Sequence, residues 1–203
     1  MTDSTILWRR LDLPGHDAAR LRKVAGGWRL EGHATYGSEE GPCALAYQVR
    51  LSARWRTRSA RIAGWIGSRP VEIRIAAGRD GTWRVDGTPM PALAGCIDLD
   101  LAFTPATNLL PIRRLGLAVG AAGTARAAWL RAAGGALEPI DQSYERLTLG
   151  TYRYVSAGGL FDRRLTVRSD GFVVDYPGQW RAEAAIAAAD SATGRKDAED
   201  DDR

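Results

Sequence analysis

Regular alternation of apolar and polar residues is the feature of this sequence that most restricts its fold. Between positions 45 and 55 every second residue is apolar or aromatic, and the positions between them are mostly polar or charged. The apolar set is Leu45, Tyr47, Val49, Leu51, Ala53 and Trp55, and stretches at 28–36 and 71–75 repeat the pattern. Because successive side chains of a strand point to opposite faces, this period of two predicts half-buried strands in a mostly antiparallel sheet.

Turn residues separate these stretches at short intervals. Asp80-Gly81 and Asp170-Gly171 are typical of hairpin turns, since glycine adopts positive φ at little cost. We expect later strands over 124–131, 143–149, 151–156, 160–168 and 172–176. Many short strands with few helices indicate a sandwich, a barrel or a roll. With no interior linker, residues 1–182 are expected to form a single domain.

Helix is expected in only two places. Thr104 is a suitable cap for a helix that begins at Pro105 and continues to Leu115, although Pro111 should break or kink it. The alanine-rich segment 182–189 suggests a short terminal helix. The following residues, 190–203, carry six acidic and three basic side chains and few apolar ones, so residues 183–203 are expected to form a short helix and a disordered acidic tail.

The basic residues raise the possibility of nucleic-acid binding. The formal net charge is +4, and all but two of the 28 basic residues are arginine. Arginine binds phosphate and stacks on bases, which would suit a nucleic-acid-binding β module. Abundant Ala and Gly beside scarce Lys and Asn indicate a coding bias instead, so no nucleic-acid partner is expected.

Metal, cofactor and export signals are missing from the sequence. The two Cys and two His residues have no zinc-site spacing, and no phosphate-binding loop, dinucleotide fingerprint or nucleophile elbow is present. We therefore expect no metal, no cofactor and no catalytic residue. Cys43 and Cys96 are expected to be buried thiols, although a disulfide stays open. Without a signal peptide or a long apolar run, the chain is expected to be cytoplasmic with no membrane span.

Two carboxylates stand close together at Asp98 and Asp100. In an extended segment both would lie on one face, about 6–7 Å apart. Such a pair could bind a cation or act on a sugar or a phosphorylated metabolite by acid–base chemistry. The alternative is structural, in which the carboxylates accept backbone N–H groups or pair with Arg113 and Arg114.

The same region carries a family resemblance. The runs Asp98–Leu101, Thr104–Asn108 and Leu110–Leu115 resemble the bacterial "Putative glycolipid-binding" family, formerly classified as a domain of unknown function. The resemblance extends over most of the chain, from Trp8 to Arg181. It implies a mainly β fold, a spiral β-roll in which a long antiparallel sheet winds around a single helix at 105–115. It also implies a homodimer.

Together these observations lead to a noncatalytic protein that binds a glycolipid or similar amphiphile. Aromatic contacts are expected from Trp55, Trp83, Tyr152 and Tyr154. A polar or anionic head group is expected to meet Arg58, Arg113 and Arg114, and to be oriented by Asp98, Asp100 and Asn108. An enzyme acting through Asp98 and Asp100, and a nucleic-acid-binding module, are the alternatives.

Overall fold

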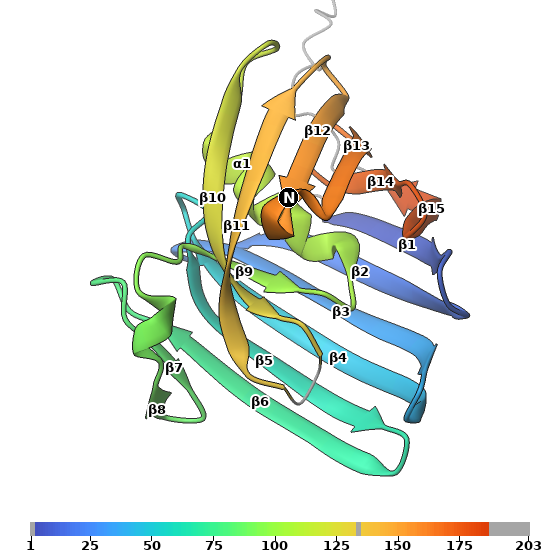
Figure 1. The fold of residues 1–203 in the computed structure, drawn as a ribbon, viewed down its shortest axis with the longest axis vertical. Coiled ribbons are helices and arrows are strands. Elements are labelled where there is room, and N and C mark those ends of the chain that lie inside the picture. The colour runs from blue at the N-terminus through green and yellow to red at the C-terminus, as the bar shows by residue number, and fades with distance from the viewer. Residues whose placement is uncertain (1–2, 133–134, 187–203) are drawn as a thin grey trace, which may run out of the picture.

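A single open sheet forms almost the whole molecule (Figure 1). The computed structural model describes residues 3–132 and 135–186, and within them one sheet contains fifteen strands. The strands are β1 (Ser4–Arg10), β2 (Gly15–Val24), β3 (Gly27–Ser38), β4 (Gly41–Ser52), β5 (Thr57–Ile66), β6 (Arg69–Ala77), β7 (Trp83–Val85), β8 (Thr88–Pro89), β9 (Asp98–Leu101), β10 (Ala122–Leu130), β11 (Leu137–Arg146), β12 (Thr151–Ser156), β13 (Phe161–Val167), β14 (Val173–Tyr176) and β15 (Trp180–Ile186). The helical elements are α1 (Leu109–Leu115) and the 3₁₀ turns η1 (Pro91–Leu93), η2 (Pro105–Asn108) and η3 (Ala157–Gly159).

The sheet departs from a simple antiparallel meander at two places. Most neighbours are consecutive antiparallel strands, as the alternation and the hairpin turns predict. The first exception is β1, which pairs with β15 in the middle of the sheet. The second is β9, which runs parallel to β10 and forms one edge, while β8 forms the other. The mainly β fold with one short α-helix is confirmed, and the sheet curls around α1 (Figure 1).

The core lies on the inner face of the curled sheet, around η2 and α1. Along β4, Leu45, Tyr47, Val49 and Leu51 are buried, and the residues between them point outward. Leu109 and Leu110 of the helix are completely buried against this face. The period of two in the sequence therefore marks the inner and outer faces correctly.

The central helix differs from expectation at Pro111. Thr104 caps the segment as predicted, and its hydroxyl oxygen accepts a hydrogen bond from the N–H of Ala106 at 3.0 Å. The change from 3₁₀ to α geometry occurs at Leu109, so Pro111 falls in the first turn of α1, where its missing N–H removes no helical hydrogen bond. The helix continues through Pro111 and ends at Gly116, which adopts the left-handed conformation with φ of 54°.

The expected C-terminal helix is wrong for residues 182–186. These residues belong to β15, which pairs with β1 and β14. The helical preference of alanine is weak, and the pairing of these residues with β1 overrides it. Residues 187–203, including the rest of the expected helix and the acidic tail, lie outside the described residues.

Strand β11 begins earlier than predicted and includes a proline. The prediction started at residue 143, and the strand starts at Leu137. Pro139 pairs with Ala128 of β10, whereas β12 pairs with β11 only from Gln142 onward. Pro139 therefore lies on a locally free edge, where a missing N–H is tolerated.

Candidate functional site

A row of short side chains crosses the outer face of the sheet. Strand register places six outward-facing residues directly beside one another, from β15 through β1 to β5. In this order they are Ala184, Leu7, Ala18, His33, Ala46 and Ala63. Because four of the six are alanine, the outer face of the sheet is recessed along this row.

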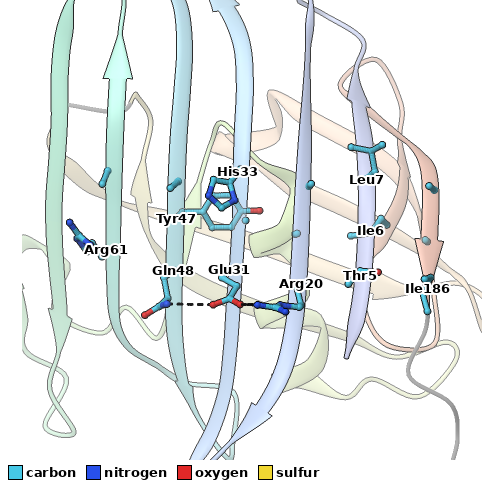
Figure 2. Close-up of a pocket in the computed structure, with 17 residues that line it drawn as sticks. Thr5, Ile6, Leu7, Arg20, Glu31, His33, Tyr47, Gln48, Arg61 and Ile186 are labelled. Carbon is cyan, nitrogen blue, oxygen red and sulfur yellow. Dashed lines mark hydrogen bonds and ion pairs between the residues drawn. The ribbon is translucent and has the colours of Figure 1, made fainter. Parts of the chain in front are cut away.

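A polar row runs parallel to the alanine row. It consists of Ile186, Thr5, Arg20, Glu31, Gln48 and Arg61. Arg20 pairs with Glu31, and Gln48 Nε2 donates to Glu31 Oε2 at 3.4 Å (Figure 2). Burial alone would raise the pKa of Glu31, but the hydrogen bond from Arg20 and the charge of Arg22 outweigh it and lower that pKa. Glu31 therefore stays ionised at the centre of this row.

Longer side chains also border the opposite side of the alanine row. Arg9 pairs with Glu183 at 2.9 Å, His16 lies 3.3 Å from the same carboxylate, and Trp65 is 45% exposed farther along. The hollow along the alanine row and the polar row has a volume of about 750 Å³, and Figure 2 shows the residues that line it. We call it the alanine furrow; its lining is Thr5, Ile6, Leu7, Ala18, Ala19, Arg20, Glu31, Gly32, His33, Ala46, Tyr47, Gln48, Arg61, Ala63, Ala184, Ala185 and Ile186.

A buried polar group lies directly beneath the floor of the furrow. Gly32 has no side chain on the inner face, and the Tyr47 hydroxyl fills that space, 2.3 Å from where a Cβ would stand. Tyr47 donates to Asp17 Oδ2 at 2.9 Å, and the Thr104 hydroxyl donates to the same oxygen. Asp17 is fully buried, and this burial raises its pKa to about 6 against the two hydrogen bonds. The outer sheet and the cap of the central helix are therefore joined through Asp17.

The two carboxylates singled out from the sequence both lie inside the roll. Arg114 holds Asp98 with two nitrogens, Nε at 3.0 Å from Oδ1 and Nη2 at 2.6 Å from Oδ2. Burial raises the pKa of Asp98, and Arg114 opposes this shift. Asp100 accepts from Gln142 Nε2 at 2.6 Å, and burial raises its pKa to about 6. The pairing of one arginine with Asp98, which the structural alternative expects, is present.

The predicted aromatic and basic residues are spread over several places. Arg113 lies over the Trp55 ring at 4.9 Å, and Trp55 stacks on Trp28 with ring centroids 4.5 Å apart. Trp83 is buried near the β8 edge, where its Nε1 donates to the Cys96 carbonyl at 3.1 Å.

The remaining predicted residues also divide between inner and outer positions. Tyr152 is buried beneath Arg146, and Arg58 is half-buried on β5. Asp100, Asn108 and Tyr154 line one small interior cavity. The structure therefore brings these three together, and it also joins Asp98 to Arg114 and Trp55 to Arg113 at separate places. Whether any of the ten contacts a ligand stays a prediction.

Sequence reasoning missed the alanine furrow. It gave weight to reactive and aromatic residues, whereas the furrow is defined by small ones. A signal was present in the alternating strands, where Ala18, Ala46 and Ala63 occupy outward positions normally taken by polar residues. Only the register between strands shows that these alanines are neighbours.

Comparison with known proteins assigns the chain to a family. The family model described as "Putative glycolipid-binding" matches residues 5–182. The chain belongs to this family. A solved structure described as a DUF1089 family protein from Pseudomonas aeruginosa is 32% identical, with a TM-score of 0.73 over 81% of this chain and 91% of that one. No curated protein matches the chain.

Three further features concern membrane spans, metal ligands and the cysteines. Within residues 3–132 and 135–186, no helix is both long and apolar enough to cross a membrane. Over the same stretches, no three His, Cys, Asp or Glu side chains gather closely enough to hold a metal ion. Cys43 and Cys96 are both buried free thiols, as expected.

Proposed function

We propose that the protein binds a glycolipid or similar amphiphile without catalysis, and that the apolar chain of this ligand lies in the alanine furrow. The observation that carries the proposal is a hollow of about 750 Å³ with an apolar floor and a polar border. Ligand pockets commonly measure about 300–1,000 Å³, so the furrow has the size of a ligand site. The family description supports the same ligand class.

The size of the interior argues for the outer face. The small cavity beside Asp100 measures about 70 Å³, because η2 and α1 fill the inside of the roll. An alkyl chain does not fit there without displacing the helix. In the open furrow each methylene is buried on one side only, so a ten-carbon chain gains less than the roughly 8 kcal/mol that complete burial would give.

The polar border suits a hydroxylated head group. Glu31 supplies a carboxylate acceptor, Gln48 supplies an amide, and Arg20 and Arg61 supply guanidinium donors along one line. Sugar hydroxyls both donate and accept hydrogen bonds, which this mixed row can match. Charged partners shorten and strengthen such bonds.

A binding titration with paired variants tests the proposal. A fluorescent or isotopically labelled alkyl glycoside is titrated below its micelle concentration into the wild type, Ala46→Leu and Ala44→Leu. Ala46 lies in the furrow, whereas Ala44 is two residues away on the same face of β4 and outside the lining. We expect Ala46→Leu to weaken binding about tenfold or more, which corresponds to two displaced methylenes, and Ala44→Leu to leave it unchanged.

Two outcomes would contradict the furrow as the site. Equal binding by both variants would place the ligand elsewhere, and the interior residues Trp83 and Tyr154 would then be tested next. Absence of binding by a folded wild type, together with a native mass that changes in Ala46→Leu alone, would instead make the furrow a contact between two copies of the chain.

Two observations weigh against the alternative functions. Asp98 is already held by Arg114, which leaves Asp100 without a free carboxylate partner for acid–base work. Many outward arginines alternate with acids, as in Arg61–Glu72 at 2.9 Å and Arg153–Asp162 at 2.7 Å. Such alternation does not form the continuous basic stripe that phosphate backbones require.

A further inference from the structure

A second, chemically different cavity lies inside the roll at the start of η2. It measures about 70 Å³ and is separate from the alanine furrow. Its walls come from η2, from the strands β9 to β15, and from the turns at Ala102, Thr104 and Gln179. The lining residues are Asp100, Ala102, Thr104, Pro105, Asn108, Trp129, Ile140, Tyr154, Ser156, Phe161, Tyr176, Gln179 and Trp180.

The charge of this cavity is unbalanced. Asp100 is the one acidic residue in the lining, and the lining contains no Arg, Lys or His. Gln142 donates to Asp100 Oδ2 at 2.6 Å, and no hydrogen bond within the described residues engages Oδ1. The nearby Asp98 cannot share a cation with it, because Arg114 already holds both oxygens of Asp98. A carboxylate in this position attracts a small positive ligand.

Neutral acceptors and aromatic rings complete the cavity. Asn108 uses Nδ2 to donate to Tyr144 at 3.1 Å, which leaves its carbonyl oxygen as an acceptor. Burial raises the pKa of Tyr154 and of Tyr176 above the usual range, so both hydroxyls stay neutral. Five aromatic residues contribute to the walls: Trp129, Tyr154, Phe161, Tyr176 and Trp180. Aromatic faces attract cations, most strongly where water is excluded.

We propose that this cavity binds a small ammonium group, either free ammonium or the terminal amine of a short alkylammonium. The N–H groups donate to Asp100 and to the uncharged acceptors around it, and the rings surround the charge. The narrow space of about 70 Å³ favours a small ammonium over a bulky trimethylated head group. The proposal is independent of the furrow and of its ligand.

Asp100 sets the pH dependence of this cavity, and the other charged groups lie around it. The Asp98–Arg114 pair lies on the β9 side, Arg10 lies over Trp180 at 5.3 Å, and the charge of Arg163 acts on Tyr176. None of these three arginines belongs to the lining. Because burial raises the pKa of Asp100 to about 6, ammonium binding should weaken as the pH falls through that value.

The test compares cations at constant ionic strength. Tryptophan fluorescence and melting temperature are followed while potassium chloride is replaced by ammonium, methylammonium or tetramethylammonium chloride. We expect saturable binding of ammonium and methylammonium at neutral pH, a rise in melting temperature, and no response to tetramethylammonium. An equal response to potassium, or none to any cation, would overturn the proposal.

Two variants assign the response to the cavity. Asp100→Asn removes the charge and should reduce methylammonium affinity about tenfold or more, since a charge-assisted hydrogen bond becomes a neutral one. Should this variant fail to fold, Phe161→Ala decides, because Phe161 is only partly buried and its removal widens the cavity. It should then admit tetramethylammonium, and unchanged selectivity would contradict the site. Ala46→Leu in the furrow should leave all of these responses intact, so the two proposals fail separately.

Discussion

At the scale of single residues, Asp17 joins the sheet to the helix cap. It is fully buried, accepts from the hydroxyls of Tyr47 and Thr104, and has one oxygen, Oδ1, without a hydrogen-bond partner. Burial raises its pKa to about 6. The folded protein therefore holds the Asp17 proton more tightly than the unfolded chain. Its favourable contribution to stability is complete below about pH 4 and is lost as the pH rises through about 6.

Replacing Asp17 by Asn removes this dependence. Asn resembles protonated Asp in shape and can accept from both hydroxyls, so at about pH 4 the variant should be close to the wild type. By about pH 8 the wild type carries a buried charge at Asp17. The unfolding free energy of the variant should then exceed that of the wild type by up to about 3 kcal/mol. Urea unfolding across this pH range measures the difference. A difference in unfolding free energy that does not change with pH would contradict the assignment.

Some residue contacts could be predicted from the sequence and others could not. The closeness of Asp98, Asp100, Arg113 and Arg114 predicts that one arginine pairs with a carboxylate, and Arg114 does so with Asp98. The Asp17 contact joins positions 17, 47 and 104, which only the folded sheet brings together. No local pattern in the sequence reports such a meeting.

At the scale of elements, the Asp98–Arg114 pair fastens the end of α1 to β9. Both side chains are largely buried, with 1% and 15% of their surfaces exposed. Arg114→Met should cost about 3–5 kcal/mol of unfolding free energy, because it leaves a buried carboxylate without its partner. Adding Asp98→Asn should restore much of this loss, and chemical denaturation of the two variants measures it.

The neighbouring arginine provides the control for this prediction. Arg113 is exposed and lies over Trp55. Arg113→Met should cost only about 0.5–1 kcal/mol, the size of an exposed cation–π contact. A comparable loss in both single variants would show that removal of helix charge, rather than the buried pair, sets the cost.

Two of the three glycines of strand β3, Gly32 and Gly37, have opposite surroundings. A Cβ on Gly32 would lie 2.3 Å from the Tyr47 hydroxyl, whereas on Gly37 the nearest atoms are 3.9 Å away. Gly32→Ala should therefore displace Tyr47 from Asp17 and destabilise the protein by about 1–3 kcal/mol. Gly37→Ala should have little effect. Thermal unfolding of both variants tests this, and equal melting temperatures would show that Tyr47 moves without cost.

Element prediction was best where the pattern was local. Strand β12 has the predicted bounds, 151–156, because a clear alternation lies between turn residues. The strand at β15 was missed because Ala184 and Ala185 give no strand signal, and pairing with β1 decides their structure. The start of β11 was missed because a proline is tolerated only where the neighbouring strand is absent.

At the scale of the whole molecule, the curled sheet around one helix followed from the family resemblance and from the alternation together. Alternation alone left a sandwich, a barrel and a roll open. The alanine furrow was beyond prediction, since it depends on the register of six strands that span positions 5 to 186.

The expected homodimer is a prediction at this scale. The chain mass is 22.0 kDa, so light scattering of the wild type should give about twice this value. If the furrow holds a ligand rather than a second copy, Ala46→Leu should keep the dimer mass while losing glycoside binding. A monomeric wild type would remove the dimer expectation and leave the ligand proposal unaffected.

The pairing of β1 with β15 also has a consequence for how the chain is connected. Thr5 and Ile186 are cross-strand partners, while β8 and β9, which follow each other in the chain, form the two outer edges. A circular permutant that joins Ile186 to Thr5 through a tight turn, and opens at the exposed Ala94-Gly95, would keep the same sheet. In this permutant, every pair of antiparallel neighbouring strands would also be consecutive in the chain. The lower contact order should speed folding without a change in architecture.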